Sequence, residues 1–395
     1  MNFFAPCPRG LEACLKAELL PLGAHILETP PGGVSFEGGD DLVYKANLWS
    51  RIASRIMVKV AEGNYETEDD IYQLALQFGW EDWFDSRKTL RVDLTSIRSP
   101  LKSMQFATLR IKDGIVDRFR EVGGERPSID THNPDVRVFG FLNGNEVTLY
   151  IDTSGEPLFK RGWRAGLDDK GAAPLKENLA AGIIALSNWD PFGLKPLYDP
   201  FCGSGTIVIE AAQMALDIAQ GSSRRFGFEN IKGFDAEQWS NERADAIKRF
   251  QKRRSMVDAV GQLLVAGSDI DAESIAQTHI NLERAGIKAD LVQINEGNVC
   301  EAFAPFEQAG IIVGNPPYGE RIELLNGTFL ELGATLRERF GGWNVHLLTN
   351  DLKFAGTIGM RERRKTPLFN GALECRLWGF EIFARKETKP AAELT

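Results

Sequence analysis

Two hydrophobic spacings alternate along the first 150 residues. Alternating apolar residues predict strands at 3–8, 32–38, 55–63 and 89–97, and apolar residues three or four positions apart predict helices between them. The stretch 1–53 is expected to form a small βαβ unit with one helix marked by Leu11, Leu15 and Leu19. The stretch 54–156 is expected to form a compact α+β module that ends in a hairpin about Asn143-Gly144.

The pattern changes after a Gly-rich polar stretch near residue 157. A helix at 174–189 is followed by short apolar strands that alternate with long amphipathic helices, a pattern typical of a parallel α/β sheet. The chain then ends in a hairpin turned by Asn370-Gly371. We therefore divide the chain into domains at 1–53, 54–156 and 157–395. The predicted strands of the last domain are 195–199, 263–270, 291–295, 310–315 and 343–350.

Composition is that of a globular, multidomain protein. Of the 395 residues, 43% are apolar and 26% are charged, which leaves no bias towards disorder. We find no amino-terminal signal pattern and no apolar run near the length of a membrane span, so we expect a cytoplasmic protein without a membrane partner. The cysteines are odd in number and scattered, which supports neither a disulfide framework nor a metal site. They are Cys7, Cys14, Cys202, Cys300 and Cys375.

Net charge alone argues against a nucleic-acid partner, because phosphate binding needs clustered Lys and Arg and the formal charge is -9. Local basic runs nevertheless occur at 160–164, 223–228, 248–254 and 361–365. A solvated helix face is the more common explanation of any one such run. Charge therefore leaves the question of a nucleic-acid partner open.

The segment LYDPFCGSGTIVIEAA, which starts at Leu197, predicts a ligand-binding turn. A strand ends at Asp199, a loop follows, and a helix begins near Thr206, so the loop faces unpaired backbone N–H groups. Gly203 and Gly205 allow the backbone to approach a ligand closely. The third glycine of the dinucleotide fingerprint is absent, and an ordinary tight turn remains the alternative.

A second acidic position follows the next predicted strand. Asp269 ends that strand, where a carboxylate of a doubly wound fold can bind the two hydroxyls of a ribose. Asp271 suits the role of helix N-cap instead. Asn298 lies beyond the following strand and is a weaker candidate to address an adenine edge.

The segment IIVGNPPYGE, at 311–320, indicates methyl transfer to an exocyclic base amine. Exocyclic base amines are poor nucleophiles because the nitrogen lone pair is delocalised into the ring. The Asn315 side-chain oxygen and the Pro316 carbonyl would accept the two N–H groups and direct the lone pair towards a methyl donor. Pro316 and Pro317 fix φ and remove competing donors. Tyr318 would stack on the base, a contact worth ~1–3 kcal/mol.

These motifs carry a family resemblance. DPFCGSGT followed by NPPYG resembles the S-adenosylmethionine-dependent amino-methyltransferases, which have a Rossmann-like class I fold. The resemblance implies that Asp199, Phe201, Gly203 and Gly205 line the methionine end of the cofactor. It further implies that Asp269 holds the ribose, Ile270 packs on the adenine and Asn298 meets the adenine amine.

The sequence upstream of these motifs points to one group within that family. Residues 126–164 resemble the end of a THUMP domain, an RNA-binding module, and APLKENLAAGI and RRFGFE resemble the THUMP-containing guanine-N2 methyltransferases of 23S ribosomal RNA. The implied fold is a Rossmann-like domain with a mostly parallel sheet and a carboxy-terminal antiparallel hairpin, preceded by an α+β ferredoxin-like and THUMP region. The implied partner is ribosomal RNA, and no metal is implied.

Alternatives to this reading stay open at the level of sequence. Some family members carry a second methyltransferase domain that this chain lacks, which weakens the assignment of a particular nucleotide. Transfer RNA guanine N2 and DNA adenine N6 remain alternative acceptors, and a non-catalytic RNA-binding protein is an alternative of another class. Pyrimidine carbon-5 methylation is set aside, because it needs a cysteine nucleophile near the target base and no cysteine here has that context.

Overall fold

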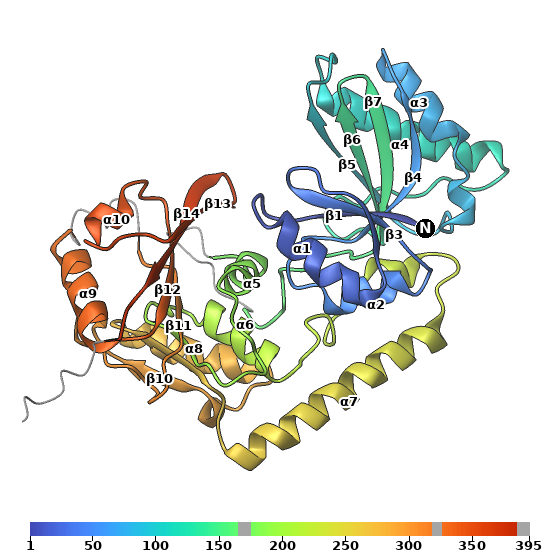
Figure 1. Ribbon diagram of the computed structural model, residues 1–395. Coiled ribbons are helices and arrows are strands. Elements are labelled where there is room, and N and C mark those ends of the chain that lie inside the picture. The colour runs from blue at the N-terminus through green and yellow to red at the C-terminus, as the bar shows by residue number, and fades with distance from the viewer. Residues whose placement is uncertain (165–174, 318–325, 385–395) are drawn as a thin grey trace, which may run out of the picture. The chain divides into compact units, whose positions relative to one another are not determined.

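The computed structural model describes residues 1–164, 175–317 and 326–384 and divides into two compact units. The first unit comprises Met1–Gly162 and Ala219–Lys248, and the second comprises Trp163–Ile218 and Arg249–Thr395. Each unit is built around one seven-stranded sheet (Figure 1). None of the helices in the described ranges combines the length and apolar character needed to cross a bilayer.

The first unit has the strand order β2-β3-β1-β4-β7-β6-β5. All its pairings are antiparallel except β5–β6, which is parallel. Its elements are β1 (Asn2–Pro6), α1 (Glu12–Leu19), η1 (Leu20–Leu22), β2 (His25–Glu28), β3 (Gly33–Glu37), α2 (Leu42–Trp49), β4 (Met57–Asn64), α3 (Glu68–Gln77), η2 (Trp80–Asp82), β5 (Leu90–Ile97), α4 (Met104–Glu121), β6 (Val136–Asn143), β7 (Glu146–Asp152) and η3 (Gly227–Asn230).

The helices α3 and α4 cover one face of the β4–β7 part of this sheet. Every second residue of β6, such as Val138 and Leu142, is buried with Ile111 and Ile115 of α4 in one core. The alternate residues of β6 point to the opposite face and are only half-buried. The predicted hairpin about Asn143-Gly144 is confirmed by the β6–β7 pairing, with Gly144 at a positive φ of 58°.

The predicted βαβ unit at the amino terminus was incomplete. The strands β1 and β3 are antiparallel neighbours because an additional strand, β2, forms a hairpin with β3. This edge strand has one half-buried residue among exposed ones, so it shows no apolar alternation to detect. The helix α2 was also missed, because six of its eight residues are buried and it lacks the polar face of a typical surface helix.

The segment 219–248 returns to the first unit. The Gln220 amide donates to the Asn47 carbonyl (2.9 Å), and the Tyr44 ring packs against Phe228 and Trp239. The first unit is thus built from two separate segments of the chain, whereas the predicted domains are each one continuous segment. The proposed boundaries at 53 and 156 stay a prediction.

The second unit has the strand order β10-β9-β8-β11-β12-β14-β13. The five strands β8 to β12 are parallel to one another. The strands β13 and β14 form an antiparallel hairpin, in which β14 pairs with β12. This arrangement confirms the predicted mostly parallel sheet with its terminal hairpin. Its elements are α5 (Glu177–Leu186), β8 (Leu197–Asp199), α6 (Thr206–Ala215), α7 (Ala236–Val260, which begins in the first unit), β9 (Val265–Asp269), α8 (Ala272–Arg284), η4 (Ala289–Leu291), β10 (Gln293–Glu296), η5 (Val299–Glu301), β11 (Ile311–Gly314), α9 (Asn326–Arg339), β12 (Asn344–Thr349), α10 (Phe354–Thr357), β13 (Arg364–Asn370) and β14 (Leu373–Glu381).

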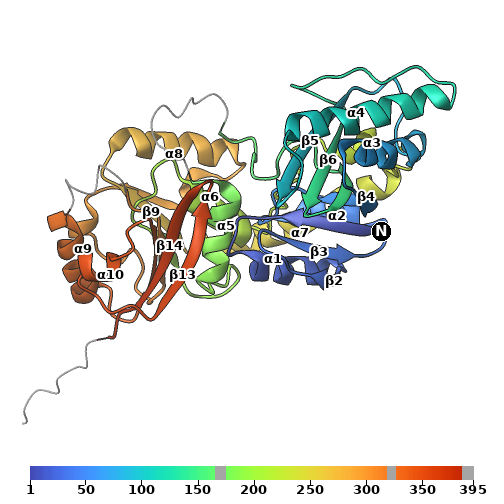
Figure 2. The same ribbon diagram turned by 90° about the horizontal axis from the view of Figure 1, so that it is seen from above.

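Helices cover both faces of the second sheet. The helices α5 and α6 lie on one side and α9 and α10 on the other (Figures 1 and 2). The chain order reverses at β8, because β9 and β10 continue on one side of it and β11 and β12 on the other. Ligands of open parallel sheets bind at such a switch point, outside the carboxyl ends of the strands.

Candidate active site

The carboxyl edge of the second sheet brings the predicted site residues together. Tyr198 of β8 is in register with Ala266 of β9 and Ile312 of β11, so these three strands end at one edge. Asp199, Asp269 and Asn315 stand at or directly after those ends. Residues more than a hundred positions apart in sequence therefore border one site.

The glycine loop between β8 and α6 depends on left-handed backbone at two positions. Gly203 has φ of 52° and Gly205 has φ of 88°, and Gly205 is the N-cap of α6. A Cβ at Gly205 would lie 2.9 Å from Cγ2 of Thr278. A Cβ at Gly203 would meet no atom within 4 Å, so the loop is open on that side. Gly205 is thus required by packing, whereas Gly203 leaves room for a ligand.

Two polar side chains of α8 hold this loop. Thr278 Oγ1 donates to the Gly203 carbonyl (2.7 Å), and Asn281 Nδ2 donates to the Ser204 carbonyl (2.9 Å). Both side chains are fully buried. Neither residue was among the predicted site residues, although two polar residues three apart on the apolar stripe of an amphipathic helix were a usable signal.

Asp269 also binds the glycine loop. The Gly203 N–H donates to its Oδ2 (2.8 Å), and the Asp271 N–H donates to its Oδ1 (3.1 Å). Each carboxylate oxygen keeps a further lone pair for a hydroxyl. The predicted N-cap role of Asp271 is confirmed, since its side chain accepts from the Ser274 N–H. Ile270, between the two acids, is 69% exposed and offers a free apolar surface.

Asp199 is a buried carboxyl at the centre of the edge. Its side chain is almost inaccessible, and its Oδ1 accepts from the Phe201 N–H (3.0 Å). Burial raises the pKa of this carboxyl well above its ordinary value, the Phe201 N–H partly opposes the rise, and the nearby Asp269 carboxylate adds to it. None of the described residues supplies a cation to it, so a cationic ligand group would stabilise its ionised form.

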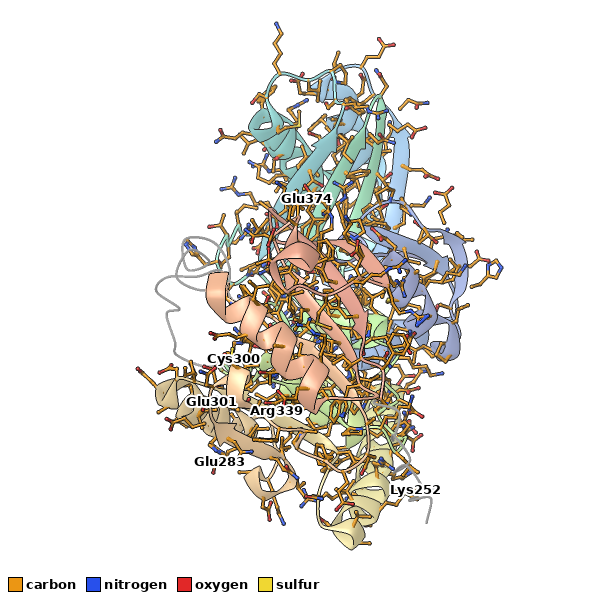
Figure 3. All side chains as sticks on the ribbon, turned by 60° about the vertical axis from the view of Figure 1, so that its left-hand side comes forward. Lys252, Glu283, Cys300, Glu301, Arg339 and Glu374 are labelled. Atoms are coloured by element: carbon orange, nitrogen blue, oxygen red, sulfur yellow. The ribbon has the colours of Figure 1, made fainter. Side chains whose placement is uncertain are left out.

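Asn298 has a local structural role. It is the N-cap of η5, and its Oδ1 accepts from the Cys300 N–H (3.0 Å). The η5 turn is held by α9, where Arg339 donates to the Glu301 carbonyl (2.6 Å), and these side chains are labelled in Figure 3. The predicted contact of Asn298 with an adenine is not tested by these bonds and stays a prediction.

The Asn315 carboxamide lies at the end of β11 with an unsatisfied acceptor. Its Oδ1 is buried and has no hydrogen-bond partner among the described residues. The preceding Gly314 is in close contact with its neighbours, because a Cβ there would lie 3.1 Å from the Phe201 ring and 3.4 Å from Asp199 Oδ1. Asn315 therefore directly follows a residue packed against the glycine-loop strand. Pro316 is buried and Pro317 is half-buried, and Tyr318 lies outside the described residues.

The residues at this edge fit S-adenosylmethionine. Asp199 is a buried carboxyl to which no described residue brings a cation, Gly203 borders open space, and Asp269 and Ile270 offer a carboxylate beside an apolar surface. These features match an ammonium group, an extended chain, a ribose and an adenine. Cys202, within the same loop, is buried and burial raises the pKa of its thiol, which makes it a poor nucleophile.

Four arginines of the basic runs make contacts within the protein. Arg161 donates to the Leu158 carbonyl, and Arg164 pairs with Glu177. Arg224 donates to the Pro157 carbonyl, and Arg249 pairs with Asp217. These four side chains are therefore engaged within the protein.

Three family models match the sequence. They are described as an RlmL ferredoxin-like domain at residues 2–57, a THUMP domain at 65–152 and an RMKL-like methyltransferase domain at 161–378. The Ribosomal RNA large subunit methyltransferase K/L of Shewanella pealeana is 38% identical over 379 residues, which make up 95% of this chain and 52% of that protein. The chain thus spans about half the length of the curated relatives it matches.

Two solved structures match over nearly the whole length. SMU.472, a methyltransferase by name that was solved as a complex with SAH, is 30% identical with a TM-score of 0.84, and the match covers 98% of both chains. A protein of Listeria monocytogenes named a predicted N6-adenine-specific DNA methylase is also 30% identical, with a TM-score of 0.83 and 96% of both chains covered.

Proposed function

We propose that this chain, which belongs to the family of RMKL-like methyltransferases with a THUMP domain, transfers a methyl group from S-adenosylmethionine to an exocyclic base amine in RNA. The acceptor we propose is guanine N2 of large-subunit ribosomal RNA. The family assignment confirms the resemblance noted in the sequence. The activity and the acceptor are our inference, supported by the site and by the names of the relatives.

The observation that carries the proposal is the unpartnered Oδ1 of Asn315. A buried acceptor without a donor costs roughly 1–3 kcal/mol, so it is retained where a ligand supplies the donor. An amine N–H is such a donor, and the carbonyl of Pro316 is the neighbouring acceptor. Two acceptors that bind both N–H groups favour a pyramidal nitrogen whose lone pair is drawn out of conjugation with the ring and towards the methyl donor.

The remaining site residues would bind and orient the cofactor. S-adenosylmethionine supplies an electrophilic methyl group on a positively charged sulfur. Asp199 would hold the cofactor's ammonium group, Gly203 would border its chain, and Asp269 would bind its ribose. No strong base is needed before the transfer, because the methylated nitrogen releases its extra proton to water afterwards. Tyr318 and Asn298 remain proposed partners of the base and the adenine.

The face of the first sheet opposite α3 and α4 is the surface we propose for RNA. Its aromatic side chains include Phe139 and Phe141 of β6 and Tyr150 of β7, which is paired with Phe139. All three rings are half-buried and absent from the core beneath α3 and α4. Bases can stack on such rings, a sequence-tolerant contact.

Arginines lie close to these rings. Arg55 lies over the Phe139 ring at 5.2 Å and pairs with Asp152, and Arg91 is 34% exposed and pairs with Asp93. Arg137 lies 3.6 Å from Asp93, and its Nε is buried without a hydrogen-bond partner among the described residues. Guanidinium groups bind phosphate oxygens. Alternating rings and cations fit a single-stranded RNA segment, in agreement with a target base that must leave its stack to be methylated.

The decisive experiment offers the protein three substrates. Undermodified ribosomal RNA, transfer RNA and duplex DNA are each incubated with labelled S-adenosylmethionine, and the nucleosides are analysed. We expect label in N2-methylguanosine of large-subunit ribosomal RNA. Label in N6-methyldeoxyadenosine would favour the activity named for the Listeria relative, and RNA binding without any label would favour a purely RNA-binding protein.

The proposed RNA surface predicts the effect of removing its rings. The double variant Phe139→Ala/Phe141→Ala should bind single-stranded RNA ~10–100-fold more weakly, because stacking is worth ~1–3 kcal/mol per base. Filter binding with a single-stranded RNA probe measures this, and cofactor affinity should not change. Phe106→Ala is the matched control, since Phe106 is a 51% exposed phenylalanine on α4. Equal losses in the double variant and the control would refute the assignment of this face.

Substitution of Asp269 is expected to weaken cofactor binding before it affects the methyl transfer. Asp269→Ala removes the acceptor of the Gly203 N–H as well as the proposed ribose partner. Cofactor affinity should fall ~10–100-fold, as expected for lost hydrogen bonds to a charged group. Calorimetric titration with S-adenosylmethionine checks this, and turnover at saturating cofactor should recover most of the wild-type rate. Unchanged affinity would remove Asp269 from the site.

A further inference from the structure

One strand end at the carboxyl edge carries a polar side chain that takes no part in the proposed binding of the cofactor or the amine. Each of the five parallel strands ends on or is soon followed by Asp or Asn, and four of these residues have been assigned: Asp199, Asp269, Asn298 and Asn315. The fifth is Asn350, which directly follows β12. Its Oδ1 is buried without a hydrogen-bond partner among the described residues, as is that of Asn315.

A turn-forming role does not explain Asn350, because the next residue performs it. Asp351 accepts from the Lys353 N–H (2.7 Å) and from the Thr357 hydroxyl (2.8 Å), and so holds the turn that leads into α10. The Asp351 N–H in turn donates to Thr349 Oγ1 (3.1 Å). The local hydrogen bonds of this turn therefore close without the Asn350 side chain.

The position of β12 assigns Asn350 to the acceptor side of the site. The cofactor residues stand on β8, β9 and after β10, whereas β12 pairs with β11 on the other side of the switch point. The register places Gly314 beside Leu347, so Asn315 and Asn350 leave neighbouring strands at the same edge. Continued by one residue, the register sets Asn315 beside Leu348, so Asn350 leaves the edge two residues further along on the adjacent strand. With a strand spacing of about 4.8 Å and a rise of about 3.3 Å per residue, the two backbones are about 8 Å apart, a separation that two carboxamides can close onto one base.

We propose that Asn350 recognises the ring N1–H of guanine beside the reacting amine. This inference rests on the proposed function and names the basis of its specificity. Guanine is the base in which an exocyclic amine stands next to a ring N–H donor. The ring nitrogen adjacent to the amine is an acceptor in adenine and in cytosine. The buried Oδ1 of Asn350 is therefore satisfied by guanine, whereas the other two bases present an acceptor to it and pair only if the carboxamide turns to donate from Nδ2.

Asn350 would select guanine because a base without the ring N–H leaves its buried acceptor without a donor. A site built to hydrogen-bond one group rejects an analogue that lacks it, because a buried polar atom then stays unpaired. For a single neutral acceptor we expect a preference of ~10–100-fold. Asn315 and Pro316 bind the amine itself and do not discriminate between the bases. Asn350 is thus a specificity-determining residue rather than part of the amine-binding pair.

The test compares three variants on undermodified large-subunit ribosomal RNA with labelled S-adenosylmethionine. Asn350→Ala should lower the rate of N2-methylguanosine formation ~10–100-fold and leave cofactor affinity and Tm unchanged. Asn350→Asp keeps an acceptor oxygen and should recover most of that loss. Asn344→Ala, at the opposite end of β12, is the matched control and should behave as the wild type.

A second arm changes the base. The nucleotide methylated by the wild type is replaced by 2-aminopurine in a synthetic RNA fragment, which keeps the amine but turns the adjacent ring nitrogen into an acceptor. The wild type should prefer guanine over 2-aminopurine by ~10–100-fold, and Asn350→Ala should treat the two alike. A preference retained in Asn350→Ala overturns this inference alone. Wild-type label in N6-methyladenosine, or no label at all, overturns the proposed function together with it.

Discussion

Asn315→Ala is expected to lose methyl transfer by ~10²–10³-fold or more while cofactor affinity stays within a few-fold of the wild type. Loss of one preorganised polar group aimed at the reacting centre costs about this much in comparable sites. The reason lies in the position of the side chain, whose Oδ1 has no partner within the described protein and is therefore free to accept from the substrate amine. Single-turnover rates at saturating RNA and cofactor measure the loss.

Removal of Asn315 Oδ1 should leave the fold intact, because the atom makes no hydrogen bond among the described residues. Asn344→Ala provides the control, since Asn344 begins the neighbouring strand β12 and its substitution leaves the carboxyl edge unchanged. Parallel losses of turnover and cofactor affinity in Asn315→Ala would contradict its role towards the amine. Turnover within tenfold of the wild type would contradict it as well.

Asp199→Asn is expected to bind S-adenosylmethionine ~10–100-fold more weakly and yet to be more stable than the wild type in the absence of cofactor. The first effect is the loss of a charge-assisted hydrogen bond to the ammonium group. The second follows from burial, which raises the pKa of Asp199 in the folded protein. Ionisation of this carboxyl at neutral pH therefore opposes folding, and an amide of the same shape does not.

The direction of the pH dependence follows from the raised pKa. The stability contributed by protonated Asp199 is complete below the pKa of the unfolded chain and is lost as the pH rises through the higher folded value. In Asp199→Asn this loss should be absent, so its advantage appears above that range. We expect a gain of roughly 2–4 °C in Tm at pH 7, the shift that about 1 kcal/mol gives in a unit of this size.

Thermal unfolding at several pH values, with and without S-adenosylmethionine, measures both effects. The cofactor should raise the Tm of the wild type and have little effect on Asp199→Asn. Asp271→Asn is a control of opposite sign, because hydrogen bonds from Ser274 lower the pKa of Asp271. It should not raise the Tm. A lower Tm in Asp199→Asn would mean that the carboxyl is stabilised by a partner, against the role proposed here.

The sequence predicted the parts of the fold that carry a periodic signal. The strands at the carboxyl edge, the hairpins at Gly144 and Gly371 and the amphipathic α8 were all found in this way. The strand β2 was not, because an edge strand exposed on both faces shows no alternation. The N-cap bond of Asn298 was not predicted, because several backbone conformations are compatible with an asparagine. The contact of Thr278 with the glycine loop was not predicted either, although its place on the apolar stripe of α8 was a usable signal.

The sequence by itself determined which chemical groups stand at the ends of the parallel strands. Strand length and alternation are local properties, and the carboxyl ends of parallel strands share one edge, so Asp199, Asp269 and Asn315 were expected near one another. Only the tertiary structure decided that Asp269 binds the loop N–H of Gly203 and that Asp199 is buried without a cation among the described residues. It also decided that the acceptors of Asn315 and Asn350 have no described partner. Desolvation and hydrogen bonding depend on atoms contributed by distant segments, and spacing along one chain does not encode them.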